Sequence, residues 1–186
     1  GNHQIHCQEA LSIPTGSIDK HDETPAGRPQ LPYSMQLGSG TFDVEGGLTY
    51  LGYEENLSWG AQLNGVLRIG RNDEEYSLGD RSQLTAWTAY KLCESSSISL
   101  RVNGEMWGDI DGARSDLNPM MVPTADPNRR GGERSDVLIG LNFIASKGAF
   151  KGHRLAFEYG VPFYQSLNGP QLETDSVFTA GWQKAW

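Results

Sequence analysis

The sequence predicts an all-β fold, an antiparallel up-and-down transmembrane β-barrel with about eight strands. Three observations lead to this prediction. Apolar and polar residues alternate with a period of two, the alternating segments are mostly about 11 or 12 residues long, and the connections between them alternate between long and short. Soluble strands average about 5–6 residues, whereas strands that cross a membrane need about 9–11. No helical pattern of useful length interrupts the alternation.

Each expected strand places its apolar residues on one face, because successive side chains of a strand point to opposite sides of the sheet. The first segment, 3–13, is the weakest, since Glu9 interrupts its apolar face. The apolar faces are Ile5, Cys7, Leu11 and Ile13 in 3–13; Phe42, Val44, Leu48 and Tyr50 in 41–52; Trp59, Leu63, Leu67 and Ile69 in 58–70; Leu84, Ala86, Tyr90 and Leu92 in 81–92; Ile98, Leu100, Val102 and Met106 in 97–108; Val137, Ile139, Leu141 and Phe143 in 134–145; Leu155, Phe157, Tyr159, Val161 and Phe163 in 153–163; Phe178, Ala180, Trp182 and Trp186 in 175–186.

The connections support a membrane barrel. Outer-membrane barrels have short periplasmic turns and longer extracellular loops. With the C-terminus on the periplasmic side, every long connection faces outward. These long loops are expected at 14–39, 71–80, 109–133 and 164–174, within a single barrel domain that spans residues 1–186.

Charge is distributed in the same way. The four long loops hold 13 acidic and six basic residues, which accounts for nearly all of the net charge of −8. A chain of this charge lacks the basic face that nucleic acid requires, so no nucleic-acid partner is expected. No stretch reaches 18 consecutive apolar residues, so no transmembrane helix is expected.

Aromatic residues gather where a membrane interface is expected. Tyr50, Trp59, Tyr90 and Trp186 lie on apolar faces near the short turns or the C-terminus, and Phe163 lies toward the other end. Trp and Tyr collect at interfaces because their rings are apolar while their polar groups stay hydrated. Trp186, after Phe178 and Trp182, is similar to the C-terminal signal that the barrel-assembly machinery binds.

Several stretches resemble the outer-membrane transporter family named for the MetA pathway of phenol degradation. They are LSIPTGSID…DETPAG, PYSMQLGSGTFD…GLTYLG, LNPMMVPTADPNRRGG and FKGHRLAFEYGVPFYQSLNGPQLETD, and the resemblance covers roughly residues 11–186. It implies a transporter in a Gram-negative outer membrane that takes up small aromatic or hydrophobic solutes without a cofactor. Family members are longer at the N-terminus, so the chain is expected to be the C-terminal part of a larger barrel.

The polar faces of the expected strands supply the candidate solute path. Its members are Arg68, Trp87, Lys91, Arg101, Glu105, Trp107, Asp136, Arg154 and Glu158. The charged members either line a path and tune its selectivity or form ion pairs that fill the interior. The mixed signs favour weak selectivity. The two tryptophans either stack on an aromatic solute or plug the interior.

Other chemistry has little support. Asp109, Asp111 and Asp116 are carboxylates of the kind that bind Ca²⁺, but they lack EF-hand spacing, so solvated loop acids bridged by divalent ions to lipopolysaccharide are the preferred interpretation. No nucleophile motif is present, although His153 with Ser166 and Asp175 is a conceivable triad. The chain is therefore expected not to be an enzyme.

Four functions remain open at this point. The leading hypothesis is passive uptake of small solutes through an outer-membrane barrel, in contact with lipid and lipopolysaccharide. The alternative is a structural or adhesive surface barrel with a filled interior whose loops bind a partner. A soluble β-sandwich or small-ligand barrel and an outer-membrane hydrolase have less support.

Overall fold

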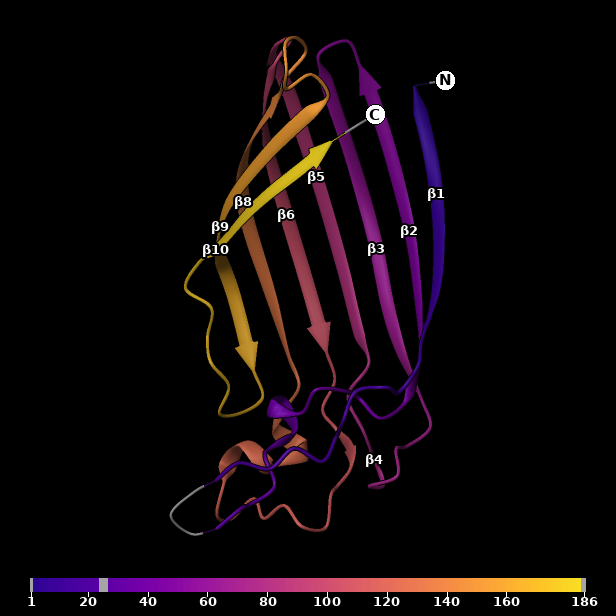
Figure 1. The fold of residues 1–186 in the computed structure, drawn as a ribbon, viewed down its shortest axis with the longest axis vertical. Coiled ribbons are helices and arrows are strands. Elements are labelled where there is room, and N and C mark those ends of the chain that lie inside the picture. The colour runs from indigo at the N-terminus through magenta and orange to yellow at the C-terminus, as the bar shows by residue number, and fades with distance from the viewer. Residues whose placement is uncertain (1, 24–26, 185–186) are drawn as a thin grey trace.

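The computed structural model describes residues 2–23 and 27–184, and its main element is a curved antiparallel sheet (Figure 1). Eight strands follow one another in the order β1-β2-β3-β5-β6-β8-β9-β10, and β4 pairs with β7 in a separate ribbon. The predicted all-β class, antiparallel pairing and eight strands are confirmed. The elements are β1 (His3–Ser12), η1 (Tyr33–Met35), β2 (Phe42–Glu54), β3 (Leu57–Ile69), β4 (Tyr76–Ser77), β5 (Arg81–Cys93), β6 (Ser96–Trp107), β7 (Asp111–Gly112), η2 (Pro123–Ala125), η3 (Pro127–Arg129), β8 (Gly132–Ile144), β9 (His153–Leu167) and β10 (Val177–Lys184).

The sheet is open between its first and last strands. Among the described residues no ladder joins β1 to β10. Figure 1 shows these two strands as the edges of the curved sheet, and β1 begins and β10 ends toward the end that carries the short turns. The described residues therefore form an open eight-stranded sheet, and the closure into a barrel that the sequence predicted, with further strands expected, is not found in it.

Long and short connections leave opposite ends of the sheet (Figure 1). The short ones are 55–56, 94–95 and 145–152, and the long ones are 13–41, 70–80, 108–131 and 168–176. The last long connection is shorter than expected, because β9 continues to Leu167, inside the 164–174 stretch that the sequence assigns to a loop. The contrast in length is consequently clear for the first three long connections and small for the fourth.

A bulge explains the extra length of β9. Ser135 pairs with Tyr164 but its neighbour Asp136 pairs with Pro162, which leaves Phe163 without a partner on β8. Proline has no N–H to give to the ladder, and a bulge is one of the few places where a sheet accommodates it. The inserted residue shifts the alternation, so Gln165 lies opposite the inward-facing Arg134.

The sheet buries almost none of its apolar side chains. The buried hydrophobic residues of the described chain are Ile18, Tyr33, Tyr76, Ile110, Ala125 and Leu138, and of these only Leu138 belongs to the eight-stranded sheet. Apolar side chains of every strand, such as Leu63, Leu100 and Phe157, are exposed on the outer face instead. Among the described residues, no helix has the length and apolar character needed to span a membrane.

The aromatic residues near the short turns contact one another on this outer face. His3 stacks on Tyr50 with 5.9 Å between ring centroids and also meets the edge of Trp59 at 6.2 Å. Trp182 donates a hydrogen bond from Nε1 to Nδ1 of His153 at 2.9 Å. Trp186, which the sequence places at the same level, lies outside the described residues.

Three long connections fold together into what we call the loop cap, formed by the described residues of 13–41, 70–80 and 108–131. Its small core consists of Tyr33, Tyr76 and Ile110, with Leu78 and Leu117 packed beside them. The rings of Tyr33 and Tyr76 meet edge to face with 4.8 Å between centroids. The main apolar core of the described chain therefore lies in the loops rather than against the sheet.

Candidate functional site

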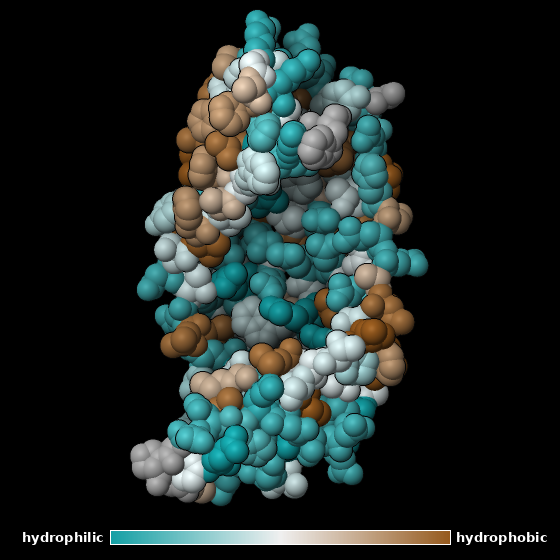
Figure 2. Space-filling view, in the orientation of Figure 1, coloured by the Kyte–Doolittle hydropathy of each residue, from teal (hydrophilic) through white to brown (hydrophobic). Residues whose placement is uncertain are grey.

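The inner face of the sheet is polar and forms the candidate site. Figure 2 shows hydrophilic residues in the hollow of the sheet and hydrophobic residues along its outer flanks. Pairs across neighbouring strands place Asp43 opposite Arg68, Gln83 opposite Glu105, and Glu105 opposite Arg134 on this inner face. The alternation that places apolar side chains on the outer face therefore also places these charged side chains together on the inner face.

Six charged residues near the long loops form one ion pair and a chain of four, which together we call the charged band. Its members, taken across the sheet, are Asp43, Arg68, Arg81, Glu105, Arg134 and Asp136. Glu105 is its centre, with one carboxylate oxygen 2.5 Å from Arg81 Nη2 and the other 3.8 Å from Arg134 Nη2. Arg134 Nε lies 3.1 Å from Asp136 Oδ2. Three positive and three negative groups leave the band neutral.

The ends of the band are the most buried parts of it. Asp43 and Asp136 are each only 2% exposed. Asp43 pairs with Arg68 and also accepts hydrogen bonds from the hydroxyls of Thr41, at 2.6 Å, and Ser39, at 3.1 Å. A buried carboxylate is costly unless it is paired and hydrogen-bonded, and these partners supply both the ion pair and the hydrogen bonds.

A second group of predicted residues meets in the middle of the sheet. Arg101 Nε donates to Glu158 Oε1 at 3.0 Å, and the Arg101 guanidinium carbon lies 5.2 Å from the ring centroid of Trp87. The flat guanidinium therefore faces the tryptophan ring in a cation–π contact. This leaves one face of the Trp87 ring already covered by the protein.

The remaining predicted residues are dispersed. Arg154 Nη2 donates to Asn142 Oδ1 at 2.7 Å, and both residues, with Lys91, line a cavity of about 390 Å³ near the short turns. Trp107 lies toward the other end, where its Nε1 donates to the Arg130 carbonyl at 2.9 Å. The nine predicted path residues thus occupy three levels along the inner face and do not converge on one centre.

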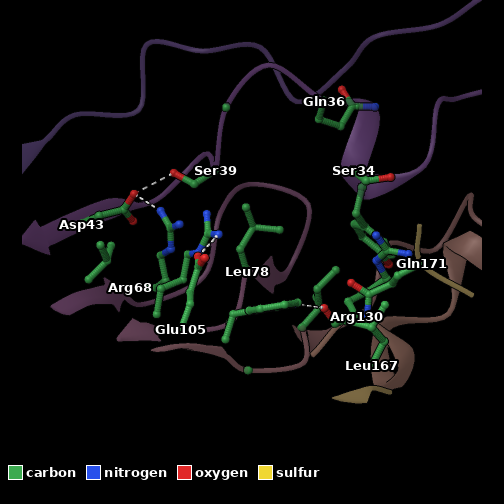
Figure 3. Close-up of a pocket in the computed structure, with 18 of the residues that line it drawn as sticks. Ser34, Gln36, Ser39, Asp43, Arg68, Leu78, Glu105, Arg130, Leu167 and Gln171 are labelled. Atoms are coloured by element: carbon green, nitrogen blue, oxygen red, sulfur yellow. Dashed lines mark hydrogen bonds and ion pairs between the residues drawn. The ribbon is translucent and has the colours of Figure 1, made fainter. Parts of the chain in front are cut away.

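A larger cavity of about 810 Å³ lies between the charged band and the loop cap. Figure 3 shows Asp43, Arg68 and Glu105 on one side of it and Arg130, Leu167 and Gln171 on the other. Asp43, Arg81, Arg134 and Arg130 line it although the sequence analysis did not select them. Asp43, Arg81 and Arg134 lie on the polar faces of their strands, so the alternation in the sequence could have identified them. Arg130 lies in a loop, and only the folded loop places it at the cavity.

The three acids of the 109–133 stretch do not form one site. The Asp109 carboxylate accepts hydrogen bonds from the backbone N–H groups of Arg130 and Gly131 and from the Asn168 amide. Asp111 pairs with Arg71 at 3.1 Å, and Asp116 pairs with Arg114 at 2.7 Å. No group of three or more His, Cys, Asp or Glu residues within the described ranges could hold a metal ion.

Arg114 contacts all three loops of the loop cap. In the sequence only the acidic residues near it hint at this role. Its side chain is 6% exposed and pairs with Asp19, Glu74 and Asp116, which come from all three loops. Nη1 also donates to the Ile18 carbonyl at 2.9 Å. Burial alone would lower the pKa of Arg114, but hydrogen bonds to Asp116 and Asp19 outweigh it and raise the pKa above its usual value.

The conceivable hydrolase triad is not assembled. His153 and Ser166 lie near opposite ends of the same strand, β9. At about 3.3 Å per residue, the 13 steps between them separate their backbones by roughly 40 Å. His153 is also engaged by Trp182.

No protein-family model matches the chain, and no curated protein matches it either. The resemblance to the phenol-degradation transporter family stays a prediction from the sequence.

Proposed function

We propose that the chain forms a β-barrel of the bacterial outer membrane through which small solutes, aromatic or hydrophobic ones among them, diffuse passively. The supporting observation is the distribution of polarity: each strand directs apolar side chains outward, while charged and polar side chains fill the concave face. Water-soluble sheets do the reverse and bury their apolar face, because removing apolar surface from water contributes about 25 cal/mol per Å².

Exposure on this scale favours a lipid environment. Soluble monomers rarely expose contiguous apolar patches larger than a few hundred Å². Here large hydrophobic side chains are exposed along all eight strands, from Ile5 on β1 to Trp182 on β10. The 13-residue strands β2, β3, β5 and β8 fit this environment. Each measures roughly 43 Å along its axis and, tilted by about 45°, spans roughly the 30 Å of a hydrocarbon core.

The two open edges require partners in a membrane. Unpaired backbone N–H and C=O groups each cost several kcal/mol in lipid, so β1 and β10 must be covered there. With eight strands in alternating directions, β1 and β10 are antiparallel and can pair directly. Additional strands inserted between them would produce the larger barrel that the sequence resemblance implies.

The inner face suits a path for solutes of low net charge. The charged band is neutral overall, and Arg101 is balanced by Glu158, so neither sign of charge dominates. The same pairs also favour the second candidate, a filled structural or adhesive barrel, because all of them except Arg134–Asp136 join two strands on the concave face. The two functions differ in whether solute passes through.

The outward position proposed for the loop cap gives it lipopolysaccharide as a neighbour. Glu23, Asp73 and Glu75 are exposed acids of the cap. Divalent cations can bridge such carboxylates to lipid phosphate, since both are hard oxygen ligands. This contact would hold the cap at the outer surface without a resident metal site.

Single-channel recording of the detergent-refolded chain in a planar bilayer tests the proposal. Stepwise conductance that changes on substituting Arg101 by Gln supports a path along the inner face, with Arg71→Gln in the loop cap as the control that leaves conductance unchanged. An inserted but electrically silent protein that also excludes neutral solutes in a liposome-swelling assay would support the filled barrel. Failure to enter lipid, with a stable monomer in detergent-free buffer, would contradict both.

A further inference from the structure

The cavity beneath the loop cap is lined by one cation, the half-buried Arg130, that has no ion pair among the described residues. In the described structure, Nη1 of Arg130 is inaccessible to water and has no hydrogen-bond partner, and Arg130 forms no ion pair. Burial lowers the pKa of its guanidinium, and no acidic group offsets this effect. A buried charge without a counter-ion is costly, so this position favours an incoming anion.

The other cations of the cavity are already paired with carboxylates. Arg68, Arg81 and Arg134 belong to the neutral charged band. Asp109, whose carboxylate accepts from the Arg130 backbone N–H, also accepts from Gly131 and Asn168, so its oxygens are occupied. Glu45, the remaining carboxylate of the lining, is exposed on β2, the strand that carries Asp43. The local excess of positive charge is therefore at Arg130.

Apolar side chains line the same cavity. Trp107 holds the Arg130 carbonyl through its Nε1, and Ile110 and Leu167 line the cavity as well. Figure 3 shows Leu167 and Gln171 beside Arg130. Gln171 is held in place because its Nε2 donates to the Gly131 carbonyl at 2.7 Å. Around Arg130 the cavity therefore combines apolar side chains with one charged group that has no ion pair, a composition that small-molecule sites commonly have.

We propose that this cavity binds a small organic anion, a monocarboxylate with an apolar body, whose carboxylate pairs with Arg130 and whose body packs against Trp107 and Leu167. The inference rests on the proposed function, because the cavity lies on the proposed solute path directly under the loop cap. The proposed path would then have a selective binding site on the side of the loop cap. A guanidinium matches a carboxylate with two parallel hydrogen bonds, which a neutral solute cannot form.

Isothermal titration of the detergent-refolded chain with benzoate and with benzyl alcohol tests the site. Benzoate is expected to bind, benzyl alcohol to bind at least about tenfold more weakly, and Arg130→Gln to remove the difference, as expected for loss of a charge-assisted hydrogen bond. Arg129→Gln is the matched control, since Arg129 is 59% exposed and pairs with Asp126. It should leave both affinities unchanged.

Equal affinity for the two ligands in the unmodified chain would overturn the inference, even if Arg130→Gln does not refold. So would retention of the benzoate preference in a folded Arg130→Gln variant. Arg130→Lys provides a further check, because lysine keeps the positive charge but lacks the two parallel N–H donors of the guanidinium. This variant is expected to bind benzoate with intermediate affinity. A separate conductance measurement distinguishes failure of this inference from failure of the proposed function. If the protein conducts but does not prefer benzoate, the proposed function stands and only the anion site is contradicted.

Discussion

At the scale of single residues, Arg114 has the strongest structural role, because one buried guanidinium joins three loops. Arg114→Met should destabilise the loop cap by about 1–3 kcal/mol, since the Ile18 carbonyl loses its donor and Asp19, Glu74 and Asp116 lose their common partner. Hydrogen exchange should accelerate in the cap and stay unchanged in the strands. Arg71→Met is the control, and removing its exposed pair with Asp111 should cost less than about 1 kcal/mol. If the two substitutions have equal effects, Arg114 does not stabilise the loop cap more than an exposed ion pair does.

The buried tyrosines of the cap make its stability sensitive to alkaline pH. Burial raises the pKa of both Tyr33 and Tyr76 above 10.0, even though the Arg114 backbone N–H donates to the Tyr33 hydroxyl, which lowers that pKa in part. A raised pKa in the folded state means that the protonated form is favoured by folding. The stability from these groups is therefore complete below pH 10 and is lost as the pH rises through the folded pKa values.

Absorbance at 295 nm measures this ionisation directly. Tyr33 and Tyr76 should be among the tyrosines that ionise late, and proteolysis of the cap should begin over the same pH interval. In Tyr33→Phe the number of late-ionising tyrosines should fall by one. Ionisation of all tyrosines in a single step near pH 10, with the cap intact, would contradict the prediction.

At the scale of strands, tryptophans lie over glycines of the neighbouring strand. A Cβ at Gly60 would lie 2.4 Å from the Trp87 ring, whereas a Cβ at Gly46 would meet nothing within 4 Å. Gly60→Ala should therefore displace Trp87 from its contact with Arg101 and cost about 1–3 kcal/mol. Gly46→Ala should be neutral or slightly stabilising, because it only restricts the unfolded chain. Urea unfolding followed by tryptophan fluorescence compares the two, and similar midpoints would show that Trp87 has room to move.

The strands were predictable from the sequence because the period of two is a local property. Each of the eight alternating segments became a strand with ends shifted by a few residues. The bulge at Phe163 was not predicted, because it depends on which residue of β8 lies opposite. Only Pro162 gave a local indication that the ladder is interrupted there.

The candidate site was predictable in part for the same reason. Alternation identifies which side chains face inward, so Arg101 and Glu158 were placed on one face correctly, and they form an ion pair. It does not identify partners on distant strands, and it fails in loops. Arg114 and Arg130 acquire their roles only when 13–41, 70–80, 108–131 and 168–176 fold against one another, which no spacing in the sequence encodes.

At the scale of the whole molecule, the exposed outer face distinguishes lipid from water as the surroundings of the sheet. Leu100 lies near the middle of β6 and is 50% exposed, and Leu172 lies in the 168–176 connection and is 98% exposed. In water both positions should tolerate arginine, because neither side chain is buried. In a membrane a charge at mid-strand meets hydrocarbon and costs about 2–4 kcal/mol, while the loop position remains hydrated.

Reversible urea unfolding from lipid vesicles measures this difference. Leu100→Arg should lower the free energy of unfolding by the about 2–4 kcal/mol that a charge costs in hydrocarbon. Leu172→Arg should leave it within about 0.5 kcal/mol of the unmodified chain. Because the same leucine is replaced by the same arginine in both variants, the comparison isolates the surroundings of the side chain. If Leu100→Arg is tolerated as well as Leu172→Arg, the outer face lies in water, and the apolar side chains along all eight strands must be covered by protein instead of lipid.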